Sequence, residues 1–221
     1  MTRALGWLVA LLALAPISAR EVVIPTGYGG SDTQRAWVLR RHLARGEHAQ
    51  ARDLLARLHA RGRKAGDFRT AFERAVSRVP ASGAVLEQLE ALAQAYPKDP
   101  LPRLARGILA IHYAWEARGS GYANQVTKQG WAGFKERIAW ADRDLDLALA
   151  ADPTLAHAHA TKIIVARAQG KSEDVIRAHL ARALEHDPGC YEAYRRAGAV
   201  HPPAAEAAAR LLREHPELGG R

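Results

Sequence analysis

A nine-residue pattern occurs twice in the second half of this chain, and it constrains the fold more than any other feature. Residues 145–153 and residues 180–188 both read L-x-x-A-L-x-x-D-P, with a separation of 35 residues. In each copy the leucines and alanines lie at helical spacing, and Asp-Pro ends the helix because proline clashes with the preceding turn. The pattern therefore predicts a chain built from repeated helical units.

The period and the positions of the turns indicate the type of repeat. A period near 34 residues is typical of tetratricopeptide helix pairs. Pro153 and Gly170 are 17 residues apart, which matches the separation between the helix-ending proline and the next turn glycine in that repeat. No segment shows sustained alternation of apolar and polar residues. We predict an all-α fold of tetratricopeptide-like antiparallel helix pairs that form a short right-handed superhelix, a type of surface that serves binding.

The ends of the chain divide it into four parts. Residues 1–19 combine Arg3 with an apolar run that is too short to span a bilayer as a helix, and they end in small residues, which predicts a cleaved signal peptide. Residues 20–31 are expected to be a flexible leader, residues 32–198 the helical-repeat domain, and residues 199–221 a short helix and tail. The expected location is the periplasm or the outside of the cell, with no transmembrane segment after cleavage.

The chain is strongly basic, with a formal charge of +9 that falls to +8 when Arg3 is removed with the signal peptide. The basic residues are scattered along the helices, which is typical of a solvated surface, although they also favour an anionic envelope component as a partner. No nucleic-acid-reading motif is present, so we expect no nucleic acid as partner. Cys190 is the one cysteine, which excludes an intramolecular disulfide, and we expect it to be an inert packing residue.

Capping and turn residues predict most helix ends. Ser31 and Gln34 form a capping-box pattern, Gly46 ends the first helix, and Ser82 caps a fourth. Asp67 is expected to cap a third helix that carries Phe68, Phe72 and Val76 on one face. A fifth helix from residue 101 to about 118 carries the strongest apolar stripe: Leu104, Ile108, Ile111 and Trp115.

The loop after the fifth helix and the helix that follows it contain the candidate binding residues. Aromatic residues surround this glycine-containing loop, where they either belong to the core or line a ligand groove. Arg118 and Asp142 lie on apolar stripes, so we expect Arg118 to pair with Asp142 or with a nearby backbone carbonyl, either as a structural clamp or as an anchor for an anionic ligand. The candidate ligand-binding residues are Trp115, Arg118, Gly119, Gly121, Tyr122, Trp131 and Asp142.

The sequence contains little evidence for a catalytic, cofactor or metal site. No nucleophile, phosphate-loop or dinucleotide motif is present, so no catalytic residue and no cofactor are predicted. His157 and His159 are two residues apart, on different sides of a helix, and His179 and His186 are too far apart to hold one ion without a third element, so no metal site is predicted. The clustered Asp142, Asp144 and Asp146 are expected to fan around a solvated helix.

One stretch resembles a known family. The run from Trp115 to Ala123 reads W-x-x-R-G-x-G-x-A, and together with the A-L-x-x-D-P helix ends it resembles the bacterial domain of unknown function 4034 family over roughly residues 35–198. The resemblance implies a tetratricopeptide-like helical domain without an established activity. Members of that family often continue into a P-R-W-G-G-S-like segment, whereas this chain has His201-Pro202-Pro203 there.

Three functional hypotheses follow. The first is an exported adaptor that binds a protein, a peptide or an envelope component, without catalysis. The second is an enzyme or small-ligand binder that uses a pocket near Arg118, Tyr122 and Asp142. The third is an accessory protein of a toxin or secretion system.

Overall fold

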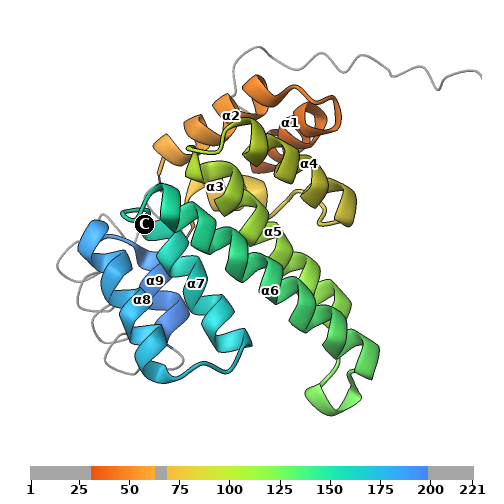
Figure 1. The fold of residues 1–221 in the computed structure, drawn as a ribbon, viewed down its shortest axis with the longest axis vertical. Helices are drawn as coiled ribbons and strands as arrows, with labels where there is room; N and C mark the ends of the chain where they lie inside the picture. Colours follow the sequence, from red (N-terminus) through yellow and green to blue (C-terminus); the bar gives the residue numbers. More distant parts are fainter. Residues whose placement is uncertain (1–30, 63–68, 199–221) are drawn as a thin grey trace, which may run out of the picture.

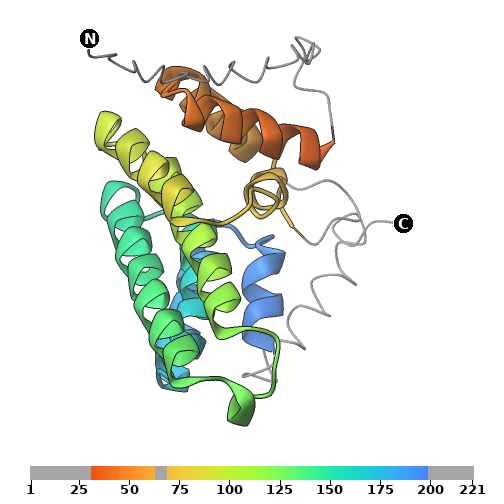
Figure 2. The same ribbon diagram turned by 90° about the vertical axis from the view of Figure 1, so that its right-hand side faces the viewer.

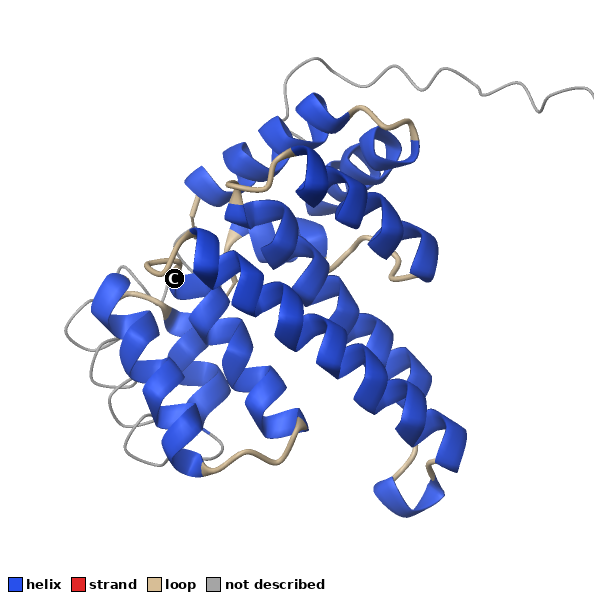
Figure 3. Ribbon diagram, viewed as in Figure 1, coloured by secondary structure: helices blue, strands red, loops and turns tan. Residues whose placement is uncertain are grey.

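The computed structural model describes residues 31–62 and 69–198. Within these ranges the chain is helical and contains no strand (Figure 3), which confirms the all-α prediction for this part of the protein. Three predicted segments lie outside the described residues. They are the signal peptide, the leader except for its last residue, and the C-terminal helix and tail. The helices are α1 (Asp32–Ala44), α2 (His48–Ala60), α3 (Ala71–Val76), α4 (Gly83–Ala95), α5 (Pro100–Arg118), the 3-10 turn η1 (Ala123–Gln125), α6 (Lys128–Ala151), α7 (Ala156–Ala168), α8 (Glu173–His186) and α9 (Tyr191–Gly198).

The predicted capping residues begin their helices as expected. The Ser31 hydroxyl accepts a hydrogen bond from the backbone N–H of Gln34, and the Gln34 side chain accepts one from the backbone N–H of Ser31 at 2.6 Å. The Ser82 hydroxyl accepts from the backbone of Val85 at the start of α4. These bonds satisfy N–H groups that have no partner inside the helix.

The third helix begins later than predicted. α3 starts at Ala71, and its cap is Thr70, whose hydroxyl accepts from the backbone N–H of Glu73 at 3.1 Å. Phe72 and Val76 are fully buried, as the stripe indicated. Asp67 and Phe68, which the sequence placed at this helix, lie outside the described residues.

The longest pair of helices is the α5–α6 hairpin, whose loop end projects away from the rest of the described chain (Figure 1). Leu104, Ile108 and Ile111 face the core, as predicted. Trp115 does not face the core fully, since it lies near the end of α5 and 47% of its surface is exposed. Gly107 allows close contact between the two helices, since a Cβ at this position would lie 3.0 Å from Cγ of Leu145 on α6.

A small group of helices forms each end of the structure. α1 and α2 turn at Gly46 and lie at one end, away from the projecting hairpin loop (Figure 2), and α7 and α8 turn at Gly170. Both glycines have a positive φ, 65° and 66°, a conformation that costs other L-residues about 1–2 kcal/mol. A second apolar cluster packs between α7, α8 and α9 and includes the buried Cys190.

Candidate functional site

Arg118 at the end of α5 lies between two tryptophan rings. Its guanidinium carbon is 5.4 Å from the ring centre of Trp115 and 5.2 Å from that of Trp131 on α6, which is cation–π distance. The same group donates hydrogen bonds to the backbone carbonyls of Gly119 and Gly121, at 3.2 and 3.1 Å. Arg118 therefore fixes the start of the hairpin loop.

The other residues of the predicted site are distributed around this arginine. Gly119 has a φ of 77°, which ends α5, and the Tyr122 side chain extends from the loop with 80% of its surface exposed. Both tryptophan rings contact the buried Phe134 edge-on, at 5.0 and 5.8 Å between ring centres. Six of the seven predicted residues thus lie together at the tip of the hairpin.

The predicted pairing of Arg118 with Asp142 is wrong. Asp142 lies further along α6, where the ammonium of Lys162 on α7 donates to one of its oxygens at 2.5 Å and Gln169 donates to the other at 2.9 Å. From residue 131 to residue 142 a helix rises by about 16 Å, so the tip and Asp142 do not share one pocket. Arg118 instead binds carbonyls, as the alternative expected, but those of its own loop and not of a neighbouring helix.

The three aspartates of α6 also differ from the expected solvated fan. Asp142 and Asp146 are four residues apart and both accept from Lys162, at 2.5 and 2.6 Å. Burial raises the pKa of Asp142, but the hydrogen bonds from Lys162 and Gln169 outweigh it, and the pKa lies below its usual value. Asp144 is the buried member, with 1% of its surface exposed, and it faces α5.

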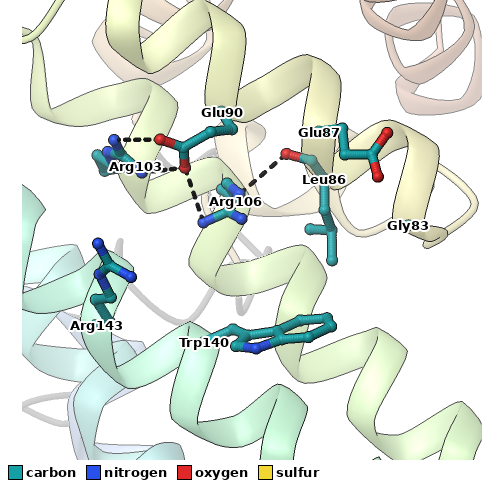
Figure 4. A pocket seen from close by; sticks show the side chains of 8 residues that line it. All are labelled: Gly83, Leu86, Glu87, Glu90, Arg103, Arg106, Trp140 and Arg143. Atoms are coloured by element: carbon teal, nitrogen blue, oxygen red, sulfur yellow. Dashed lines mark hydrogen bonds and ion pairs between the residues drawn. The ribbon is translucent and has the colours of Figure 1, made fainter.

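A pocket of about 380 Å³ lies where α4, α5 and α6 meet (Figure 4). The sequence did not single out this site, because its residues come from three helices and carry no motif. It is lined by Gly83, Leu86, Glu87, Glu90, Arg103, Arg106, Trp140 and Arg143.

The floor of the pocket is held by a network of charged side chains. Arg103 donates to both oxygens of Glu90, at 2.5 and 2.8 Å, and also to Asp144 at 3.0 Å. Arg106 donates to both oxygens of Asp144, at 2.8 and 2.7 Å, and to the carbonyl of Leu86. The bidentate bonds of Arg103 to Glu90, and the bonds that Arg106 makes through Nε and Nη1, fix the planes of the two guanidinium groups, so the floor is ordered before any ligand binds.

Burial and neighbouring charges have opposite effects on the pKa values of the two carboxyl groups in this network. The hydrogen bond from Arg103 is the main cause that lowers the pKa of Glu90, which is partly exposed. For Asp144 burial has the larger effect and raises the pKa, while the two arginines act against it. Asp144 is therefore a buried carboxylate whose desolvation the two guanidinium groups partly offset.

The rim of the pocket differs from its floor. Arg143 and Glu87 are exposed and form no hydrogen bond or ion pair within the described residues, and they lie on different sides of the opening (Figure 4). The indole of Trp140 is 38% exposed and flanks the same opening. The rim thus offers one free cation, one free carboxylate and an aromatic face.

The histidines approach one another more closely than the sequence indicated. His159 on α7 contacts two histidines of α8. Its Nδ1 atom is 3.5 Å from Nδ1 of His179, and its ring stacks on that of His186 with 6.3 Å between the ring centres. Even so, no three histidine, cysteine or carboxylate side chains of the described chain are placed to hold one metal ion. Among the described helices, none is both long enough and apolar enough to cross a membrane.

Comparison with known proteins found no matching family model, no similar curated protein and no similar solved structure. The resemblance to the domain of unknown function 4034 family therefore stays a prediction.

Proposed function

We propose that this protein is an exported helical-repeat binding protein that holds a peptide segment of a partner protein in the pocket between α4, α5 and α6. The observation that carries the proposal is the contrast between floor and rim. The charged groups of the floor are paired with one another, whereas Arg143, Glu87 and Trp140 of the rim are exposed to an incoming ligand.

The rim defines the chemistry of the segment. Trp140 offers area for an apolar side chain, and tryptophan and arginine are the residues that most often dominate binding energies at interfaces. Arg143 fits a carboxylate and Glu87 fits a cation or an N–H donor. The volume of about 380 Å³ falls in the usual range for ligand pockets and is enough for one or two residues.

The arrangement of the helices supports a binding scaffold. The α1–α2 and α7–α8 pairs use the same type of glycine turn at equivalent points, and α6 and α8 both end at an Asp-Pro. These similarities favour tetratricopeptide-like pairs in a short right-handed superhelix, an architecture that presents an extended surface to partners.

The expected signal peptide places this scaffold in the periplasm or outside the cell. The proposal for this location rests on the sequence of residues 1–19 alone. Mass measurement of the protein purified from its native cells tests it. A chain that begins at or near Arg20 is expected, and a soluble cytoplasmic chain that retains residues 1–19 would contradict export.

Selection from a phage-displayed library of linear peptides tests the pocket. Peptides selected on the wild-type protein should bind the Trp140→Ala and Arg143→Glu variants at least tenfold more weakly. Trp37→Ala and Arg40→Glu are matched controls, because Trp37 is 44% exposed and both residues lie on α1, which contributes no residue to the lining of the pocket. Selected peptides that bind all four variants equally well, or a selection without binders, would overturn the proposal.

A further inference from the structure

The tip of the α5–α6 hairpin is a second surface that the proposed pocket does not use. It projects beyond its neighbouring helices in Figure 1, and aromatic side chains near its end are exposed. Tyr122 is 80% exposed and Trp115 is 47% exposed, although tyrosine and tryptophan side chains are on average more buried than this. Tyrosine and tryptophan, which have an apolar ring and a polar group, are enriched where proteins meet the headgroup region of a bilayer.

The loop end of the hairpin carries a net positive charge. Residues 117–135 contain Arg118, Lys128 and Lys135 and no aspartate or glutamate, whereas Glu116 and Glu136 border this stretch on either side. Neither lysine forms an ion pair within the described residues, and both are exposed. The tip is therefore a net basic surface whose two lysines are not paired with a carboxylate within the described residues.

The cation between the two tryptophans is held in place. Its contacts with both rings and with the carbonyls of Gly119 and Gly121 hold the Arg118 side chain against the start of the loop. An arginine in this position lies beside the exposed aromatic side chains, so that the tip combines a positive charge with amphipathic rings.

We propose that the hairpin tip docks on an anionic lipid surface, with Tyr122 and Trp115 at the level of the headgroups and the basic residues against lipid phosphates. Charge complementarity favours this occupant, since each basic residue near an anionic bilayer strengthens binding about fivefold. The tip projects outward, and the pocket lies elsewhere on the structure, so a planar surface fits it better than a peptide. The inference is independent of the proposed peptide pocket and of export.

Co-sedimentation with lipid vesicles tests this docking. The full-length protein is mixed with vesicles of phosphatidylcholine alone and with vesicles of equal parts phosphatidylcholine and phosphatidylglycerol. Binding to the anionic vesicles is expected, together with weak binding to the neutral ones and a loss of binding at high salt, which screens surface charges.

Three variants locate the contact. Lys128→Glu should weaken binding to anionic vesicles roughly tenfold or more, because it replaces an attracted charge by a repelled one. It should not weaken the fold, since Lys128 is the first residue of α6 and a carboxylate is favourable at a helix N-terminus. Tyr122→Ala should weaken binding severalfold, whereas Tyr122→Trp should retain it.

Trp37→Ala on α1 removes an equally exposed tryptophan far from the tip and should bind like the wild type. Because all variants share the same N-terminal residues, a difference between them arises at the substituted side chain. Absence of vesicle binding, equal binding to neutral and anionic vesicles, or binding that Lys128→Glu leaves unchanged would each overturn the proposal. None of these outcomes affects the peptide pocket.

Discussion

Arg196 on α9 and Glu73 on α3 form an ion pair at 2.8 Å, with 4% and 6% of their side-chain surfaces exposed. His157 on α7 lies 3.2 Å from the same Glu73 oxygen. Burial alone raises the pKa of Glu73, but the charge of Arg196 and the hydrogen bond from His157 outweigh it, so that this pKa lies far below its usual value. The pair thus connects the N-terminal helices with the C-terminal helices through a buried charge.

Removing either member of this pair should destabilise the protein strongly. Arg196→Met or Glu73→Gln leaves a buried charge without its partner, a change that typically costs about 3–5 kcal/mol. The double variant should lose less than the sum of the two single losses, because it strands no charge. Urea unfolding followed by circular dichroism measures these differences.

The exposed pair of Arg177 and Glu173 on α8 supplies the control for that experiment. Its two groups are 2.7 Å apart but about half exposed. Arg177→Ala should therefore change the free energy of unfolding by less than about 0.5 kcal/mol. Equal losses at the exposed and the buried pair would show that burial of Glu73 contributes nothing.

Acid should destabilise the α7–α8 hairpin through His179. Burial, and then the charges of Lys162 and His159, lower the pKa of His179 from 6.5 to about 4. The unfolded chain therefore binds this proton more tightly than the folded one, and the stability that neutral His179 provides is complete above about pH 6.5 and is lost as the pH falls towards 4.

Stability measured between pH 7 and pH 4.5 checks this dependence. His179→Gln should lose less stability over this interval than the wild type does. Val175→Ala, a substitution without a titratable group on the same helix, should keep the wild-type slope. If His179→Gln also keeps that slope, then His179 is not the group that titrates.

Substitution of Gly107 should reveal the close contact between α5 and α6. A glycine-to-alanine change inside a helix usually stabilises by about 0.5–1 kcal/mol. At Gly107, however, the new Cβ would meet Cγ and Cδ2 of Leu145 at 3.0 and 3.2 Å, so we expect a net loss of about 1 kcal/mol. Thermal melting of Gly107→Ala beside Gly83→Ala, which has open space around it, measures the difference. A stabilised Gly107→Ala variant would show that Leu145 moves aside at little cost.

Cys190 should be unreactive in the folded protein. It is 6% exposed, and burial raises the pKa of its thiol to about 12, so the reactive thiolate is scarce at neutral pH. Reaction with Ellman's reagent should be slow in buffer and rapid in urea. Rapid modification without denaturant would contradict the packing role of this residue.

Local signals in the sequence predicted most helix ends, and their success has a physical cause. Ser31, Ser82 and Gly170 act through hydrogen bonds or backbone angles within a few residues of themselves, so a single sequence contains the needed information. Thr70 satisfies the same rule, but Asp67 offered an equally good cap nearby, and nothing local decided between them.

The faces of the long helices were harder to predict. α6 packs against α5 on one side and against α7 on another, and this divides its aspartates between Arg106 and Lys162. The stripe on α6 gave no indication of which helix lies opposite each residue, so Asp142 appeared buried and Asp144 solvated. The pocket was missed for the same reason, because Glu87 of α4, Arg106 of α5 and Trp140 of α6 meet only when three helices pack together.

The continuous course of α6 fixes a distance. From Lys128 at the tip to Trp140 at the pocket the helix rises by about 18 Å, because both residues lie on the uninterrupted α6. The spacing between tip and pocket is therefore set by the length of a helix and not by a loop. A peptide segment held at Trp140 would therefore stay at a constant distance from a surface on which the tip rests. Lengthening or shortening both helices of the hairpin by whole turns would change that distance in steps of about 5 Å.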